Sequence, residues 1–396
     1  MTYLPTAEHD ELRAVVREVA TEQIAPRAAE IDAKAEFPWD LKELLARQDL
    51  LGTGFEERHG GTALDTIGQA IVAEEIARAD ATTSLIPIVQ KLGALPITMA
   101  GSEEQKDRYI PRLASGEWLI AFALTEAAAG SDVSSNRMRA RLDGDCYVLN
   151  GSKRFITHGS VANVLTVFAL TDPDVGGRKG MSAFIVETDT PGFAVARVEH
   201  KMGIRGSPTA ELNFDDVRVP VENRLGAEGD GFHIAMDTLD RSRLSIAAQA
   251  VGIAQGAIDE ATRYATDRRQ FDQRVIDFQG IQFMLADMVS QTEAARQLTY
   301  AAAARVGANA SDLAYWTSCA KLIAGDTAMR VTTDAVQVLG GYGYITEYPV
   351  ERMMRDAKIT QLYEGTQQIQ RLIIARQILQ RGGVGASQRT QEQPRP

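Results

Sequence analysis

The chain has few of the residues that build disulfide frameworks and metal sites. Its 396 residues include only two cysteines and five histidines. Cys146 and Cys319 are too few for a disulfide scaffold or a thiolate cluster. The histidines are scattered, with no pair at a spacing typical of metal ligands. The sequence therefore predicts no bound metal and no disulfide framework.

Blocks of basic residues and long apolar runs are absent as well. The formal net charge is −11, and no cluster of lysine and arginine stands out to offset it, which argues against a nucleic-acid partner. No apolar run approaches the length of a membrane span, and the N-terminus lacks the basic start and apolar middle of a signal peptide. We therefore expect a cytoplasmic protein with no nucleic-acid and no membrane partner.

The sequence does contain enough apolar residues for a sizeable core, at 44% of the chain, and they follow three successive patterns. Helical periodicity dominates residues 1–116. Short alternating runs between turn residues occupy 117–225, and the helical period returns over 226–385. We expect an N-terminal helical domain, a middle antiparallel β-barrel or sandwich, and a C-terminal bundle of four long helices. The polar residues 386–396, with two prolines, are expected to be a disordered tail.

Individual elements can be placed from local signals. Asp143-Gly144 between two alternating runs predicts a hairpin. Pro26 should end or bend the first helix, and Ser102 is the expected cap of another. Gly382-Gly383 is the expected end of the last helix. The runs expected to form strands are Trp118–Leu124, Cys146–Leu149, Asn163–Leu170, Ser182–Glu187, Phe193–Val198 and Glu211–Val219.

One stretch, Met354–Arg376, concentrates chemistry at a junction between helices. Glu364 falls where one helical segment should end and the next begin, with Thr366 as the expected N-cap of the second. Gly365 allows the backbone to approach whatever Glu364 faces. A carboxylate in apolar surroundings can act as a base, although most glutamates beside a turn are solvated and inert. Local pattern alone therefore favours the inert interpretation.

The same stretch closely resembles the catalytic segment of the acyl-CoA dehydrogenases, in which the glutamate of Y-E-G-T is the base. The resemblance covers the chain from about Ala7 to Arg381. It implies FAD as cofactor, Glu364 as the catalytic base, and the α+β multidomain fold of that family, with a helical domain, a β domain and a four-helix bundle. In the family, a loop like the one containing His59 joins two helices, so His59 is expected on the surface.

Two further segments resemble the family's flavin-binding motifs. Phe122–Asp132 resembles T-E-P-x-A-G-S-D, which implies that Thr125 bonds the isoalloxazine and that Ser131 lies at the pyrophosphate or the acyl thioester. Ala127 departs from the usual proline, which predicts a looser loop. The residues of this segment implied to bind FAD are Phe122, Leu124, Thr125, Gly130 and Ser131.

Asn150–Thr157 resembles N-G-x-K-x-(W/F)-I-(T/S). The resemblance implies FAD contacts from Phe155, Ile156 and Thr157, with Thr157 near flavin N5. An aromatic in a strand is otherwise a core residue, and Phe155 could serve both purposes. His158 replaces a common asparagine, and it is either a harmless loop residue or a change in reactivity near N5.

The remaining contacts are implied by resemblance alone. The substrate side comprises Ser131, Leu239, Asp240, Arg243, Tyr363 and Gly365. The remaining FAD contacts are Arg268, Phe271, Gln337, Gly340, Gly341, Thr366 and Gln368. In the family the segments at 268–271 and 337–341 reach the flavin of a neighbouring subunit, which implies a homotetramer built as a dimer of dimers. Lys201–Thr209 also matches the family and is expected to be structural. Ser242 stands where the isovaleryl branch carries its base, so Glu364 remains the candidate.

The expected activity is α,β-dehydrogenation of a short- to medium-chain acyl-CoA, straight or branched, to the trans-2-enoyl-CoA. FAD N5 would accept the hydride, and an electron-transfer flavoprotein would reoxidise the flavin. Three alternatives stay open: an acyl-CoA oxidase that uses O₂, a dehydrogenase specific for acyl carrier protein, and a flavin-free binding paralogue.

Overall fold

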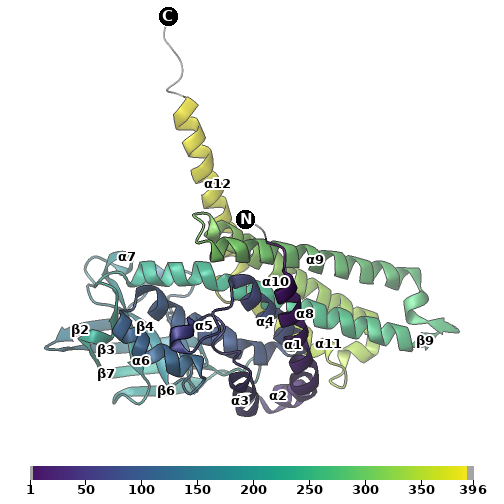
Figure 1. The fold of residues 1–396 in the computed structure, drawn as a ribbon, viewed down its shortest axis with the longest axis horizontal. Helices are drawn as coiled ribbons and strands as arrows, with labels where there is room; N and C mark the ends of the chain where they lie inside the picture. The colour runs from purple at the N-terminus through teal and green to yellow at the C-terminus, as the bar shows by residue number, and fades with distance from the viewer. Residues whose placement is uncertain (1–2, 390–396) are drawn as a thin grey trace, which may run out of the picture.

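The computed structural model describes the backbone of residues 3–389 and the side chains of residues 3–380. Figure 1 shows a β domain at one end of the molecule, long helices running away from it, and the N-terminal helices packed beside both. The succession of helical, β and helical parts confirms the fold class expected from the sequence.

The N-terminal part is helical, as predicted. Its helices are α1 (Ala7–Val19), α2 (Ala28–Lys34), α3 (Trp39–Arg47), α4 (Thr66–Ala79), α5 (Ala81–Ala100) and α6 (Glu103–Ala114). Between α1 and α2 the turns change to π and then 3₁₀ geometry through Pro26, so the expected bend is present. Ser102 and Gln105 form a capping box on α6. Asp80 caps α5 by accepting the N–H of Thr83 at 2.8 Å.

The middle part is a single sheet in the order β6-β7-β3-β2-β4-β5-β8, with β1 paired to β4 off that path. Its strands are β1 (Ile120–Ala123), β2 (Arg139–Asp143), β3 (Cys146–Thr157), β4 (Val164–Leu170), β5 (Met181–Glu187), β6 (Phe193–Val198), β7 (Thr209–Pro220) and β8 (Arg224–Leu225). Most pairs are antiparallel, but β4 runs parallel both to β2 and to β1, with Ile120 of β1 opposite Val164. Parallel strands are joined by long connections, so local alternation could not reveal this pair.

The predicted hairpin joins β2 to β3, shifted by one residue. Asp143 pairs with Cys146, so the turn consists of Gly144 and Asp145, and Gly144 has a φ of 67°. A short helix, α7 (Gly177–Gly180), lies between β4 and β5. The strands of the sheet contribute to two apolar clusters, which give the flavin-motif residues at the ends of β1 and β3 a rigid base.

The C-terminal part is a bundle of long helices. They are α8 (Gly231–Asp267), α9 (Gln279–Gly307), α10 (Leu313–Leu339), α11 (Val350–Ala357) and α12 (Gln367–Arg389), and two short strands, β9 (Arg269–Gln270) and β10 (Gln273–Arg274), follow α8. Buried alanines such as Ala254 on α8 and Ala328 on α10 belong to one core cluster. Small side chains let these two helices approach closely.

Two expectations about this fold are wrong. The last helix does not end at Gly382-Gly383, because α12 continues to Arg389 and leads away from the body of the molecule (Figure 1). Glycine weakens a helix by about 1 kcal/mol without forbidding helical geometry. Residues 386–389 of the expected disordered tail are therefore helical, and 390–396 lie outside the described residues. His59 is buried rather than exposed, with Nε2 2.9 Å from Oδ1 of Asp107 on α6.

Two buried carboxylates on α4 connect the N-terminal helices to the bundle. Glu75 accepts hydrogen bonds from Arg17 on α1 at 2.9 Å, and Glu74 accepts from Tyr300 on α9 at 2.7 Å and from Arg296 at 2.9 Å. Breaking one side of a buried ion pair leaves an uncompensated charge, so these contacts hold α4 firmly between α1 and α9. The next helix, α5, is thereby fixed as one wall of the site described below.

No helix within residues 3–389 combines the length and the apolar character needed to cross a membrane.

Candidate active site

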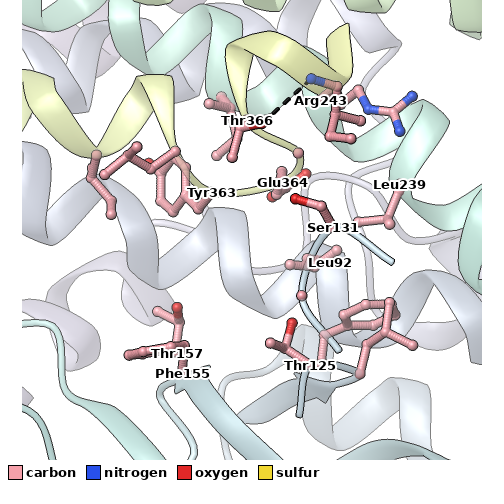
Figure 2. Close-up of a pocket in the computed structure, with 18 of the residues that line it drawn as sticks. Leu92, Thr125, Ser131, Phe155, Thr157, Leu239, Arg243, Tyr363, Glu364 and Thr366 are labelled. Carbon is pink, nitrogen blue, oxygen red and sulfur yellow. Dashed lines mark hydrogen bonds between the residues drawn. The ribbon is translucent and has the colours of Figure 1, made fainter. Parts of the chain in front are cut away.

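A cavity of about 940 Å³ opens where the three parts of the chain meet. Its walls come from α5, the ends of β1 and β3, the segment before β7, the start of α8, and the turn that leads into α12. Of the sequence-predicted site residues, the structure brings these to the cavity: Phe122, Leu124, Thr125, Gly130, Ser131, Phe155, Ile156, Thr157, Leu239, Arg243, Tyr363, Glu364, Gly365 and Thr366. Figure 2 shows Glu364 on one side of the open space, with Thr125, Phe155 and Thr157 on the other.

Glu364 lies in a turn with an unusual backbone. Its φ is 49° and that of Gly365 is 90°, so two consecutive residues are left-handed. The positive φ favours glycine at 365, and a Cβ there would also come 2.7 Å from Nε2 of Gln370 and displace that side chain. Thr366 accepts the N–H of Ile369 at 3.4 Å, which matches its expected role as the N-cap of α12.

The Glu364 carboxyl group faces a mixture of apolar surface and polar partners. Burial raises its pKa, and four neighbours oppose that rise: the hydroxyl of Ser242, which donates to Oε2, then Arg243, then the lysines Lys321 and Lys91. The pKa stays above the ordinary glutamate value. A carboxylate with a raised pKa is a stronger base once it is ionised, which suits abstraction of a weakly acidic proton.

Tyr363 is held on the opposite side of the same turn. Its hydroxyl donates to Oε1 of Gln249 on α8, and Nε2 of Gln249 donates to Ser84 Oγ at 2.9 Å and to the Ala81 carbonyl at 3.2 Å on α5. Burial raises the pKa of Tyr363, and the adjacent Glu364 adds to that rise. Tyr363 is therefore a neutral wall residue, and the chain of bonds ties the turn to two helices.

The opposite side of the cavity presents an aromatic ring and free hydroxyls. Phe155 is 57% exposed although it lies in strand β3, and its φ is 57°. This backbone turns the ring out of the sheet core and toward the cavity, so the core-packing interpretation is wrong in the chain as it stands. Among the described residues, the side-chain hydroxyls of Thr125 and Thr157 have no hydrogen-bond partner. Both line the cavity and remain available to a ligand.

The loop that carries Thr125 is braced despite the missing proline. Buried Lys153 donates to Oε1 of Glu126 at 2.9 Å and to the Leu124 carbonyl at 3.0 Å. Glu126 also accepts the backbone N–H groups of Arg137 at 2.7 Å and Met138 at 3.0 Å. These bonds replace the rigidity that Ala127 does not supply, so the loop is better fixed than its sequence predicts.

His158 lies behind the cavity wall and does not line it. The side chain is 1% exposed and packs edge-on against Phe37, with ring centroids 5.1 Å apart. Burial, and to a lesser extent the charge of Lys201, lowers the pKa of His158 to about 3. A neutral, enclosed imidazole favours the harmless interpretation, although its position is buried and not a surface loop.

Seven predicted site residues do not line the cavity: Asp240, Arg268, Phe271, Gln337, Gly340, Gly341 and Gln368. Asp240 pairs with Arg243 beside it. The Arg268–Phe271 segment lies at β9, at the far end of the bundle from the sheet (Figure 1). There Phe271 is 86% exposed, and the Arg268 guanidinium lies over the Tyr342 ring at 5.2 Å. Within a single chain the Arg268–Phe271 segment therefore lies too far from the cavity to contact a ligand bound there.

Several lining residues were missed at the level of sequence. Residues 199–204 line the cavity, including the start of the Lys201–Thr209 segment that was expected to be structural, and so does an aliphatic face of α5 that includes Leu92. Apolar positions on a buried helix look identical to core positions in a sequence, so periodicity could not have separated them. Burial, with the charge of Arg205, lowers the pKa of Lys201 to about 8, a signal that only the structure provides. Within the described residues no cluster of side chains could hold a metal ion.

Comparison with known proteins agrees with this architecture part by part. Residues 6–117, 121–217 and 229–379 match the family models described as the N-terminal, middle and C-terminal domains of acyl-CoA dehydrogenase. A probable acyl-CoA dehydrogenase of Mycobacterium tuberculosis is 50% identical over 372 residues, covering 94% of this chain and 95% of that protein. The cyclohex-1-ene-1-carbonyl-CoA dehydrogenase of Geobacter metallireducens is 50% identical over 366 residues, covering 92% and 96%.

A solved structure of butyryl-CoA dehydrogenase from Megasphaera elsdenii is 43% identical, with a TM-score of 0.93, and covers 96% of this chain and 100% of that one. The chain therefore belongs to the acyl-CoA dehydrogenase family of flavin-dependent oxidoreductases. The family assignment made from the motifs is confirmed.

Proposed function

We propose that this protein oxidises a short- to medium-chain acyl-CoA, straight or branched, to the trans-2-enoyl-CoA with FAD as cofactor. The observation that carries the proposal is the placement of Glu364 across the cavity from Thr125, Phe155 and Thr157 (Figure 2). An acyl thioester between the two sides would have its α-carbon facing the carboxylate and its β-carbon facing the opposite wall. Because both carbons are held in place, the two difficult C–H cleavages become one oriented reaction.

The residues opposite Glu364 fit a flavin. Phe155 offers an exposed ring face, Thr125 and Thr157 offer free hydroxyls, and Ser131 lines the cavity from the loop that also carries Thr125. Isoalloxazine is a flat heterocycle with hydrogen-bonding edges, which such a surface suits. Gly130 leaves open space, since a Cβ there would meet nothing within 4 Å. When bound, FAD supplies the two-electron acceptor that takes a hydride from the β-carbon at N5.

Glu364 would remove the α-proton. Its raised pKa strengthens the carboxylate as a base, while Ser242, Arg243 and the two lysines keep enough of it ionised. The backbone N–H of Glu364 makes no hydrogen bond within the described residues, so it is free to donate to the thioester oxygen. A donor placed there would stabilise the negative charge that develops as the α-proton leaves.

The acyl group would lie against aliphatic side chains that include Leu92 and Leu239, and Asp240 and Arg243 would border the path of the coenzyme A moiety. Relatives that act on butyryl-CoA and on a cyclic carbonyl-CoA support a compact acyl group. Electron-transfer flavoprotein is the proposed oxidant of the reduced cofactor. In a homotetramer, the flavin of a neighbouring subunit would be contacted by Arg268, Phe271, Gln337, Gly340 and Gly341. Gln368 would be a further FAD contact.

The proposal is tested with Glu364→Gln, which keeps the shape of the side chain and removes the base. We expect the variant to retain bound FAD and to bind acyl-CoA. The rate at which butyryl-CoA bleaches the flavin should fall by at least about 10³-fold, because the α-proton has no acceptor. Anaerobic stopped-flow absorbance measures this rate. Bleaching at the wild-type rate would remove Glu364 from its role, and peroxide formed at each aerobic turnover of the wild type would point to an oxidase.

A further inference from the structure

The turn that carries Glu364 is held from outside by a buried lysine. Two consecutive left-handed residues, Glu364 and Gly365, are a backbone arrangement that persists only where the surroundings enforce it. From α12, Nε2 of Gln370 donates to the carbonyls of both residues, at 3.2 Å and 2.9 Å. From α10, Nζ of Lys321 donates to the Gly365 carbonyl at 2.7 Å and to Oε1 of Gln367 at 3.1 Å.

Lys321 is an unusual residue to find in this position. Its side chain is fully buried on α10, and in the reaction described above it enters only through its charge near Glu364. A buried ammonium carries a large desolvation penalty, so its retention calls for specific partners. Among the described residues, its hydrogen-bond partners are a carbonyl on the turn that carries Glu364 and a side-chain amide at the start of α12. The lysine thus joins α10 to the element that aims the Glu364 carboxylate.

The same ammonium contributes to the electrostatics of the base. The groups that face Glu364 are Ser242 and Arg243 from α8, Lys321 from α10, Lys91 from α5, and Tyr363 from its own turn. Burial lowers the pKa of Lys321 to about 8, and the charge of Glu364 opposes that shift. Arg243 and Asp326 are the other charged groups facing Lys321. The lysine is therefore mostly protonated near neutral pH and favours the ionised form of Glu364.

We propose that Lys321 is a positioning residue for proton abstraction: it clamps the Gly365 carbonyl, fixes the direction of the Glu364 carboxylate, and favours its ionised form. This role rests on the proposed function of Glu364 as the base. Lys321 touches neither substrate nor cofactor, and it acts only through the turn. The two parts of the role, geometry and charge, lead to separate measurable effects.

The test is Lys321→Met, which keeps the length of the side chain and removes both the charge and the donor. We expect flavin reduction by butyryl-CoA to slow by roughly ten- to a hundredfold, because small misplacement of a reacting group has effects of that size. The acid limb of the pH–rate profile should move to higher pH, since the base loses a nearby cation. Substrate deuterated at the α-carbon should show a larger isotope effect than with wild type, and the turn at 362–366 should exchange its amide hydrogens faster.

Gln370→Leu is the matched control, because it removes a donor to the same carbonyls without changing charge. We expect it to slow the reaction and to leave the acid limb where it is. If Lys321→Met does not accumulate as folded holoenzyme, Lys321→Gln, which keeps a donor but not the charge, is measured in its place.

Two results would overturn the proposal, and they differ from failure of the proposed function. A Lys321→Met enzyme with wild-type rate and pH profile, alongside an inactive Glu364→Gln, would remove Lys321 from its role and leave the base in place. Reduced thermal stability with an unchanged rate per bound flavin would show that the lysine serves only the fold. Activity retained by Glu364→Gln would instead remove the base itself.

Discussion

At the scale of single residues, the site depends on neighbouring side chains that change the pKa of Glu364. Ser242 is the clearest example, because its hydroxyl donates to the Glu364 carboxylate and opposes the rise in pKa that burial causes. The residue lies on α8, far from Glu364 in the sequence, yet its buried hydroxyl reaches the Glu364 carboxylate. A donor to a carboxylate stabilises the ionised form, which is the form that can accept a proton.

Ser242→Ala should therefore raise the pKa of Glu364 further. A single hydrogen bond to a charged group contributes about 1.5 kcal/mol or more, which corresponds to a shift of about one pH unit. Because an acid with a higher pKa is deprotonated only at higher pH, the acid limb of flavin reduction should move upward by that amount. Stopped-flow bleaching recorded from about pH 5 to about pH 9 measures the position of this acid limb. Ser242→Thr keeps the hydroxyl and serves as the control, and an unmoved limb in Ser242→Ala would contradict the assignment.

At the scale of elements, the braced loop after β1 supports the side of the cavity that is proposed to hold the flavin. Lys153 on β3 and Glu126 on the loop form an ion pair, with Lys153 fully buried, and Glu126 also caps two backbone N–H groups. Burial lowers the pKa of Lys153 to about 8, and Glu126 opposes that shift. The loop therefore relies on a charge placed in the strand next to it.

Lys153→Met should leave the Glu126 charge buried without its partner and lower the free energy of unfolding by about 3–5 kcal/mol. FAD content after purification should fall with it, because Thr125 and Ser131 lie on the same loop. Denaturant unfolding and the absorbance ratio of flavin to protein measure the two effects. In a double-variant cycle, Glu126→Gln should add little to Lys153→Met; full additivity would mean that the two side chains do not support each other.

Sequence patterns anticipated these elements well where the signal was local. The expected strand at Phe193–Val198 has the observed bounds, and the expected helices around Glu364 leave it in a turn. The pairing of β1 with β4, the left-handed backbone of Phe155 and the burial of His59 were not visible, because each depends on residues distant in the sequence. The motifs identified both sides of the cavity, whereas its aliphatic lining was indistinguishable from core.

At the scale of the whole molecule, some residues predicted to bind the cofactor lie away from the cavity of their own chain. Arg268, Phe271 and the glycines at 340 and 341 lie away from the cavity and at the far end of the bundle, with Phe271 almost fully exposed. Exposed flavin-contact residues are expected if the site is completed by another copy of the chain. An arginine there suits a pyrophosphate, because its planar fork forms paired charge-assisted hydrogen bonds.

Arg268→Ala should accordingly weaken FAD retention by about one to two orders of magnitude, the effect of losing a charge-assisted hydrogen bond. The unfolding temperature should change little, since the Arg268 guanidinium has no ion pair among the described residues and lies over the ring of Tyr342. Flavin release during gel filtration measures the first outcome, and thermal unfolding of the flavin-free protein measures the second. Arg268→Lys keeps the charge but loses the planar guanidinium, so its FAD retention should fall between those of wild type and Arg268→Ala. If Arg268→Ala held flavin as tightly as wild type, the flavin contact would lie elsewhere.

The left-handed backbone at Glu364 has a consequence for how this enzyme could be redesigned. Glycine is the residue that adopts a positive φ without strain, so removing the side chain at 364 would relax the turn and not break it. The hydroxyl of Ser242 already reaches the Glu364 carboxylate. If a carboxylate side chain replaced Ser242 and glycine replaced Glu364, the proton acceptor would come from α8 instead of the turn, and the cavity would keep its walls. Either position would then be able to supply the proton acceptor, and substrate shape would decide between them.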